Sequence, residues 1–201
     1  MNELNNNKKT FFGYYLPTNS LSISLIGIFG ALVCVVTMVI AFPVPATNGY
    51  INIGDAMVML TAIIFGPVIG GIAGGVGSAL ADLFLGYILY APATLIIKAL
   101  EGIVVGLIAN PKNIAKRFSY RDIIGVLIGG LIMVIGYFIY EIILYGLYAA
   151  IYEVILNGLI QYGLGILISL LLTVPLRKAL DESISQIYES IYIVDKQKFA
   201  E

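Results

Sequence analysis

A glycine-rich apolar run that carries a single acid decides the fold of this chain. Residues 69–86 read IGGIAGGVGSALADLFLG. About 20 apolar residues, rising 1.5 Å each, span the hydrocarbon core of a bilayer. The small residues recur three and four positions apart, a spacing that lets helix backbones approach closely in lipid. We therefore expect Ile69–Gly86 to be a membrane-spanning helix packed inside a bundle of other helices.

The composition of the whole chain places most of it in lipid. Of its 201 residues, 60% are hydrophobic and only 11% are charged, whereas about a quarter of a soluble domain is charged. Histidine is absent and Cys34 is the single cysteine, which excludes a disulfide framework, imidazole metal ligation and histidine-activated nucleophiles. With a net charge of −1, the protein has no overall positive potential that would attract nucleic acid. We expect no catalytic site, no metal and no cofactor.

Working outward from Ile69–Gly86, five further apolar runs predict helices. The second run in chain order is the shortest and the least certain. An all-α integral membrane domain of six transmembrane helices is therefore expected over residues 22–176, with an external loop at 43–55 and polar tails at 1–21 and 177–201. The first twenty residues carry no motif and are expected to be disordered, and residues 177–191 predict a short amphipathic helix. The five further spans are Ser22–Phe42, Ala56–Phe65, Tyr90–Ala109, Ile123–Tyr148 and Ile151–Leu176.

The basic residues predict the orientation of these spans. All but one of the 11 Lys and Arg residues lie in the N-terminal tail, in residues 110–122 or in the C-terminal tail. With six spans, all three segments fall on one side of the membrane, and basic segments stay in the cytoplasm. We therefore predict that both termini are cytoplasmic. The first apolar run is longer than the core of a signal peptide, so we expect it to be retained.

Ionisable side chains inside the spans mark a candidate binding site, because each is costly in lipid. They recur at helical spacing together with other polar residues, so four of the six spans each present one polar stripe. The predicted orientation puts these stripes in the outer half of the membrane, which indicates a pocket that opens to the outside. The stripes are Ser78, Asp82 and Gly86; Tyr90, Thr94, Lys98 and Glu101; Tyr137, Glu141 and Tyr145; and Glu153, Asn157 and Gln161.

Two interpretations of these residues remain open. The polar groups can pair with one another and hold the bundle together, with Lys98 paired to Glu101 or Asp82. However, four carboxylates and one lysine cannot all be neutralised in pairs, so a carboxylate left over faces water or a ligand, or takes up a proton. The many tyrosines can form an interfacial belt or stack on a planar ligand.

The first span carries a second seam of small residues. Gly27 lies four residues before Ala31, and Gly30 lies four before Cys34. Such a seam packs inside the bundle or docks the helix of a partner protein. The chain has no phosphate-binding loop of the GxxxxGK[ST] type, so we expect no nucleotide site in it.

Several local motifs resemble one transporter family. They are Gly49-Tyr-Ile-Asn52-Ile-Gly54-Asp55, Phe65-Gly-Pro67, the glycine run into Asp82, and Tyr90-Ala-Pro92 leading to Lys98-Ala-Leu-Glu101-Gly102. Together with six spans in about 200 residues, they resemble the S component, or substrate-binding subunit, of an energy-coupling-factor (ECF) vitamin transporter. The nearest subgroup takes riboflavin, pyridoxine or pyrimidines, and the resemblance covers about residues 22–176.

The resemblance implies a mechanism and a set of partners. An S component binds a vitamin from outside beneath a lid, here the loop 43–55, and then associates with a transmembrane T subunit and two cytoplasmic ATPases. The family docks through an AxxxA motif on its first helix, whose positions here are Gly27 and Ala31, with Gly30 and Cys34 beside them. The implied substrate-binding residues are Asn52, Asp82, Tyr90, Thr94, Lys98, Glu101, Glu141, Tyr145, Asn157 and Gln161.

The excess of carboxylates disfavours an anionic ligand and favours a neutral or weakly basic heteroaromatic one. The main rival function is a self-contained proton-coupled secondary transporter or channel, in which Asp82, Glu101 or Glu141 relays protons. Many such transporters have two related halves, and no internal repeat is visible here. An intramembrane enzyme and a purely structural subunit are weaker rivals, because Ser78 has no histidine to activate it and a scaffold does not explain the polar stripes.

Overall fold

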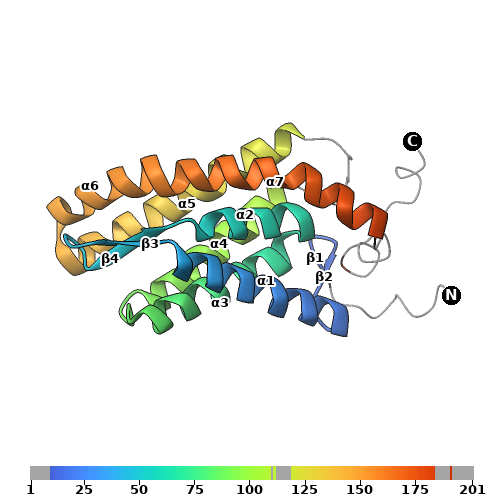
Figure 1. Cartoon of the computed structure of the whole chain (residues 1–201), viewed down its shortest axis with the longest axis horizontal. Coiled ribbons are helices and arrows are strands. Elements are labelled where there is room, and N and C mark those ends of the chain that lie inside the picture. Colours follow the sequence, from blue (N-terminus) through green and yellow to red (C-terminus); the bar gives the residue numbers. More distant parts are fainter. Residues whose placement is uncertain (1–9, 110, 112–118, 184–190, 192–201) are drawn as a thin grey trace.

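The computed structural model describes residues 10–109, 111, 119–183 and 191, and within them the protein is a bundle of helices with two small β-hairpins (Figure 1). One hairpin pairs β1 with β2 and the other pairs β3 with β4, both antiparallel. A π-helical turn joins the last two helices. In chain order the elements are β1 (Thr10–Phe11), β2 (Tyr14–Tyr15), α1 (Ser20–Val39), β3 (Ala41–Val44), β4 (Gly49–Asn52), α2 (Gly54–Phe65), α3 (Pro67–Leu85), α4 (Ala91–Ala109), α5 (Tyr120–Tyr145), α6 (Leu147–Leu156), the π turn (Asn157–Gln161) and α7 (Tyr162–Ser183).

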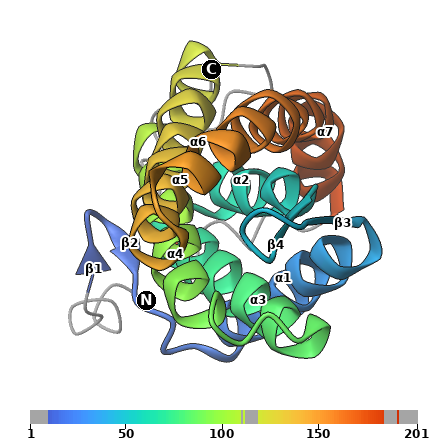
Figure 2. The same ribbon diagram turned by 90° about the vertical axis from the view of Figure 1, so that its left-hand side faces the viewer.

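Within the described residues, five helical stretches are long and apolar enough to cross a membrane. The last of them runs without a break from Leu147 to Leu180 through α6, the π turn and α7. The expected second span is different in kind. At 1.5 Å per residue, α2 is about 18 Å long, short of a hydrocarbon core of about 30 Å, and all of its residues except Met57 are buried. Figure 2 shows α2 in the middle of the ring formed by the other helices.

The turn between α2 and α3 explains why α2 is short. Gly66 has a φ of +86°, a region that glycine occupies without strain. The aromatic ring of Tyr14 lies over this glycine, because a Cβ added there would be 2.3 Å from the Tyr14 Cε1 atom. Pro67 then begins α3, where its missing N–H group leaves no hydrogen bond unmade.

The glycine run in α3 packs inside the bundle, as its pattern predicts. A Cβ added to Gly77 would lie 2.4 Å from the backbone oxygen of Gly30 in α1. A Cβ added to Gly102 in α4 would lie 2.5 Å from the backbone oxygen of Gly70 in α3. The small residues therefore allow α1 and α4 to touch α3 backbone to backbone.

Two expected helix boundaries are wrong. The first helix ends at Val39 rather than Phe42, because residues Ala41–Val44 pair with Gly49–Asn52 to form the β3–β4 hairpin. The external loop is thus a short antiparallel hairpin. The fifth helix ends at Tyr145, and Gly146, with a φ of +85°, separates it from α6.

The described parts of the two expected polar tails, before α1 and at the end of α7, are folded against the bundle. Residues 10–15 form the β1–β2 hairpin, and Tyr14 is buried against the C-terminal end of α2, so the expected disorder is wrong for this segment. Arg177, which was expected to begin the C-terminal tail, is 6% exposed in α7 and forms a bidentate ion pair with Asp122, its two nitrogens 2.7 and 2.8 Å from the carboxylate oxygens. Helix α7 continues to Ser183, and the rest of the predicted amphipathic segment, apart from Ile191, lies outside the described residues.

The start of α1 and the end of α7 lie at one end of the bundle, and the β3–β4 hairpin lies at the other (Figure 1). This arrangement agrees with termini on one side of the membrane. The assignment of that side to the cytoplasm stays a prediction, since most of the basic residues behind it lie in segments 1–9, 112–118 and 192–201, outside the described residues.

The small-residue seam of α1 divides between two faces. Gly27 and Ala31 are exposed on the surface of the bundle, and nothing lies within 4 Å of a Cβ added to Gly27. Gly30 faces Ala73 of α3 at 3.7 Å, and Cys34 is buried. Gly30 and Cys34 therefore pack within this chain, and the partner interface on α1 stays a prediction. Gly27 and Ala31 remain available for one.

Candidate functional site

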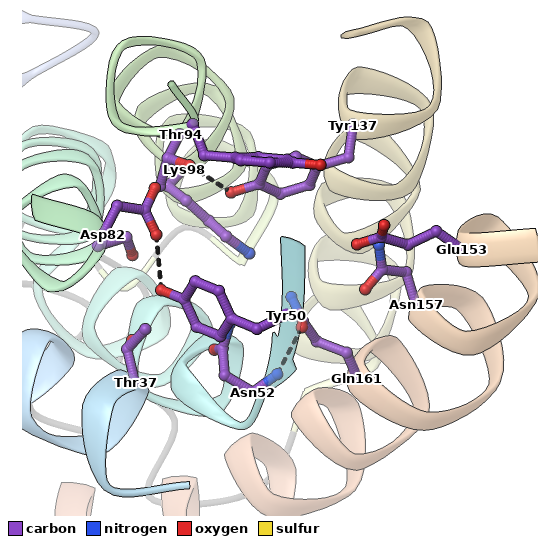
Figure 3. A pocket seen from close by; sticks show the side chains of 12 residues that line it. Thr37, Tyr50, Asn52, Asp82, Thr94, Lys98, Tyr137, Glu153, Asn157 and Gln161 are labelled. Carbon is purple, nitrogen blue, oxygen red and sulfur yellow. Dashed lines mark hydrogen bonds between the residues drawn. The ribbon is translucent and has the colours of Figure 1, made fainter. Parts of the chain in front are cut away.

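A polar pocket lies at the β3–β4 end of the bundle, where the polar stripes of α3, α4, α5 and the π turn converge (Figure 3). In this conformation its free volume is about 20 Å³, which is room for a single water molecule. The hairpin side chains fill much of the remaining space. The lining residues are Thr37, Tyr50, Asn52, Ser78, Asp82, Tyr90, Thr94, Lys98, Tyr137, Glu153, Asn157 and Gln161.

The β3–β4 hairpin closes the pocket through Tyr50. The Tyr50 hydroxyl donates a hydrogen bond to Asp82 Oδ1 at 2.6 Å, and its ring packs against Tyr87 with 4.5 Å between ring centroids. Burial, reinforced by the Asp82 charge, raises the pKa of Tyr50 above its ordinary value, so the phenol stays a donor. The second oxygen of Asp82 accepts no hydrogen bond from a described residue.

Lys98 is the centre of a buried ionic network. Its ammonium group donates to Asp55 and to Glu101 Oε2, the latter at 3.0 Å. Asp55 also accepts a 2.9 Å hydrogen bond from the Gln161 amide. Lys98, Asp55 and Glu101 are at most 2% exposed. Lys98 therefore pairs with Glu101, one of its two expected partners, and with Asp55 rather than Asp82.

Asn52 and Gln161 connect the hairpin to the helices beneath it. The Asn52 side-chain oxygen accepts from the backbone N–H of Gly54 at 2.8 Å, which starts α2. The Asn52 backbone N–H donates to Gln161 Oε1, also at 2.8 Å. Gln161 and Asn157 lie at the two ends of the π turn and both line the pocket. Such widened helical turns are frequent at functional sites.

Three tyrosines, Tyr90, Tyr137 and Tyr145, gather around the pocket near the β3–β4 hairpin. The Tyr90 hydroxyl donates to the backbone oxygen of Thr47 in the hairpin at 2.9 Å, and the Tyr90 ring stacks on Tyr145 at 6.4 Å with an interplanar angle of 21°. Tyr137 donates to the Thr94 hydroxyl at 2.9 Å. Because the hydroxyl groups of Tyr90 and Tyr137 bond to the hairpin and to α4, these two buried rings are held inside the protein and do not belong to a lipid-facing belt.

Seven of the ten predicted binding residues line the pocket directly. The other three, Glu101, Glu141 and Tyr145, reach it through a neighbour: Glu101 through Lys98, Tyr145 through Tyr90, and Glu141 through Glu153. The site residues therefore come from four separate helices and the hairpin.

Sequence reasoning did not predict Thr37, Thr47, Tyr50 or Asp55 as parts of this site. Thr37 lies on an otherwise apolar helix, and the other three belong to the external segment. Asp55 carried one usable signal, because an acid in the first turn of a helix is typical of an N-terminus. Only the tertiary fold brings it under Lys98.

The unpartnered polar atoms of the pocket suit the binding of a ligand. Among the described residues, no group of three or more His, Cys, Asp and Glu residues can hold a metal ion. Carboxylate and amide oxygens dominate the atoms without a partner, so the pocket offers acceptors to a ligand that carries hydrogen-bond donors.

The chain is similar in sequence to several known proteins. A curated protein of Pyrococcus woesei, described as an "Uncharacterized protein in gap 3'region", is 44% identical over 137 residues, which cover 68% of this chain and 88% of that protein. A "UPF0397 protein" of Streptococcus pneumoniae is 37% identical over 100 residues, which cover 49% of this chain and 54% of its own length.

A solved structure described as "Structure and mechanism of the S component of a bacterial ECF transporter" covers 80% of this chain and 95% of its own, at 25% identity and a TM-score of 0.48. The family "ECF-type riboflavin transporter, S component" matches residues 18–178, from just before α1 into the last turns of α7. The chain is thus a multi-pass membrane protein, a transporter subunit rather than an enzyme, and belongs to the family of ECF-type riboflavin transporter S components.

Proposed function

We propose that this protein is the high-affinity binding subunit of an ECF-type importer that captures a vitamin or vitamin precursor from outside the cell. The substrate occupies the pocket beneath the β3–β4 hairpin. Riboflavin, pyridoxine and a hydroxymethylpyrimidine are the candidate substrates. A transmembrane T subunit and cytoplasmic ATPases then supply the energy for release inside.

The observation that carries this proposal is the convergence of buried acceptors on one closable pocket. Asp82 Oδ2 and Asn157 Oδ1 are buried without a hydrogen-bond donor from the described residues, and unsatisfied buried polar atoms are costly. Tyr50 lines the same pocket from a two-stranded hairpin and is hydrogen-bonded to Asp82 Oδ1, so movement of the hairpin away from Asp82 would admit a ligand that satisfies these atoms.

The exposed faces support a partner-dependent mechanism. The pocket lies at the end of the bundle opposite the described start of α1 and end of α7. The cytoplasmic assignment of those two ends makes the pocket face outward. The exposed small residues Gly27 and Ala31 leave a smooth strip on α1, which suits the close approach of a T-subunit helix.

The first test is thermal stabilisation of the purified full-length protein by riboflavin, pyridoxine and hydroxymethylpyrimidine. A ligand at 100 times its dissociation constant stabilises the folded state by about 2.7 kcal/mol, or about 5–10 °C in melting temperature for a chain of this size. We expect one compound to give such a shift, and Asp82→Asn to reduce it. A panel without any shift would refute the proposal.

The second test separates an importer subunit from a self-contained transporter. Reconstituted vesicles that contain this chain alone should not accumulate the ligand under a proton gradient. Co-reconstitution with T and ATPase subunits should give ATP-dependent uptake, and Gly27→Leu, which places a bulky side chain on the exposed strip, should abolish uptake while the thermal shift persists. Proton-driven uptake by the chain alone would favour the secondary transporter instead.

A further inference from the structure

Two buried carboxyl groups lie side by side next to the pocket. Glu141 of α5 is 1% exposed and Glu153 of α6 is 2% exposed, and the two side chains are in direct contact. Glu153 accepts a hydrogen bond from the Thr47 hydroxyl of the hairpin. Neither oxygen of Glu141 accepts a hydrogen bond from a described residue. The pair is therefore only half satisfied.

No cation of the described chain balances this pair. The ion pairs among the described residues join Lys98 to Asp55 and Glu101, and Arg177 to Asp122. Arg121 donates to the backbone oxygen of Ile108 at 2.8 Å, at the far end of the bundle. Two carboxyl groups in contact share a proton, and the negative charge that remains on the buried pair has no cationic partner, so a positive group brought in from outside is attracted here.

Aromatic rings complete the surroundings of the pair. The Tyr90 hydroxyl lies close enough to Glu141 and Glu153 for both carboxyl groups to act on it electrostatically. Around the Tyr90 ring lie Tyr140, edge-on at 5.7 Å, and Tyr145, stacked at 6.4 Å. Tyrosine faces attract cations through the negative charge of the π system. Carboxylates flanked by such rings are the surroundings that an organic cation requires.

An amide oxygen from a third element points to the same kind of ligand. Asn157 in the π turn is 4% exposed, lines the pocket and contacts Glu153, and its Oδ1 atom accepts no hydrogen bond from a described residue. Figure 3 shows Glu153 and Asn157 side by side, pointing across the pocket towards Lys98 and Tyr50. An N–H group placed here can donate to Asn157 and to a carboxylate together.

We propose that the substrate carries a positively charged nitrogen, an ammonium or a protonated amino-heterocycle, which binds between the Glu141–Glu153 pair, the Asn157 amide oxygen and the ring of Tyr90. This inference rests on the proposed function, since it assigns one end of the same substrate. The rest of the ligand extends towards Asp82 and Tyr50, where the Asp82 Oδ2 atom accepts a further hydrogen bond.

Matched ligand pairs test the charge directly. Pyridoxamine and pyridoxine differ by an aminomethyl group in place of a hydroxymethyl group on one ring, and the aminomethyl and hydroxymethyl forms of the pyrimidine differ in the same way. Their dissociation constants are measured by calorimetry on the full-length protein, with riboflavin as a neutral reference. We expect the cationic member of at least one pair to bind about 10- to 100-fold more tightly than its neutral partner, the combined effect of a charge-assisted hydrogen bond and a cation–π contact.

The variants Glu141→Gln and Glu153→Gln keep the side-chain shape and remove the charge. Each should reduce the preference for the cation to about twofold or less, well under 1 kcal/mol, and leave affinity for the neutral partner nearly unchanged. Tyr148→Phe is the control, because Tyr148 is 91% exposed on the neighbouring turn of α6, and it should leave both affinities unaltered. Melting of the ligand-free protein provides a further readout: Glu141→Gln should melt at the same temperature or higher, since Glu141 accepts no hydrogen bond that glutamine would lose.

The outcomes separate this inference from the proposed function. If a neutral compound binds as tightly as its cationic partner, or if Glu141→Gln keeps the preference, the protein remains a vitamin-binding subunit and the cation subsite is refuted. A large fall in the melting temperature of ligand-free Glu141→Gln would show a structural role and would also refute it. Absence of binding by every compound would overturn both.

Discussion

Replacement of Lys98 by methionine should destabilise the protein before it affects ligand binding. Methionine keeps the length of the side chain and removes the charge. Lys98 is 2% exposed, and its ammonium group is shared by Asp55 and Glu101, both fully buried. Loss of the ammonium leaves two carboxylates facing each other in a medium of low dielectric constant.

The magnitude follows from this burial. Removal of one partner of a buried ion pair typically costs about 3–5 kcal/mol, because the remaining charge is left uncompensated. For a chain of about 200 residues, each kcal/mol lowers the melting temperature by about 2–4 °C. Lys98→Met should therefore melt about 6–20 °C below the wild type. A lysine that only contacts the ligand would behave differently, because its replacement would leave the melting temperature of the ligand-free protein unchanged.

The assay compares melting curves of the ligand-free protein in detergent for the wild type, Lys98→Met and a triple variant. The triple variant adds Asp55→Asn and Glu101→Gln, which neutralise the two stranded acids while keeping their shape. Because replacing a complete buried ionic cluster by neutral groups is often close to neutral, the triple variant should recover at least half of the lost melting temperature.

Two results would refute this reasoning. A melting temperature of Lys98→Met within about 2 °C of the wild type, less than 1 kcal/mol, would show that the ion pairs contribute little. A triple variant that melts below the single variant would show that the two carboxylates are not the source of the instability.

Three further predictions concern packing, the far end of the bundle and the hairpin. Gly102→Ala places a methyl group 2.5 Å from a backbone oxygen of α3 and should cost about 1–3 kcal/mol of stability in a melting experiment. Its control is Gly163→Ala, which has open space around it and should be neutral or stabilising by up to about 1 kcal/mol. Equal effects of the two substitutions would contradict the close packing of α4 on α3. Arg177→Met leaves the fully buried Asp122 carboxylate without its partner and should lower the stability of the fold by about 3–5 kcal/mol. Ligand affinity, measured below the melting range, should stay unchanged. A loss of affinity without a loss of stability would contradict a structural role for this ion pair. Tyr50→Phe removes the hydroxyl group that donates to Asp82. Ligand dissociation, measured by stopped flow, should become about tenfold faster, the equivalent of about 1.4 kcal/mol. An unchanged dissociation rate would show that this hydrogen bond does not hold the hairpin closed.

Much of the fold follows from local properties of the chain. The apolar runs, the glycine spacing in α3 and the break at Gly66-Pro67 depend on helix length, backbone approach and glycine conformation, which act over a few residues. The break at Gly146 was not predicted. The polar stripes were equally local, because positions three and four apart share a helix face. For this reason most of the residues that line the pocket belong to the predicted polar stripes.

The partners of those residues were decided by the tertiary structure. Residues 41–52 are not strongly strand-like in sequence, and they form a hairpin because the bundle beneath them offers Gln161 and Asp82 as hydrogen-bond partners. Lys98 and Asp55 are 43 residues apart in the chain, and no local pattern relates them. The small residues of α1 likewise could not be assigned from the sequence. The pair Gly27 and Ala31 and the pair Gly30 and Cys34 have the same spacing of four residues, yet the first pair lies on the surface and the second packs inside the chain. The local sequence determines which residues share a face of a helix. Charge balance among buried groups is decided by the tertiary structure, because each charge is stabilised by whichever opposite charge the fold brings within reach.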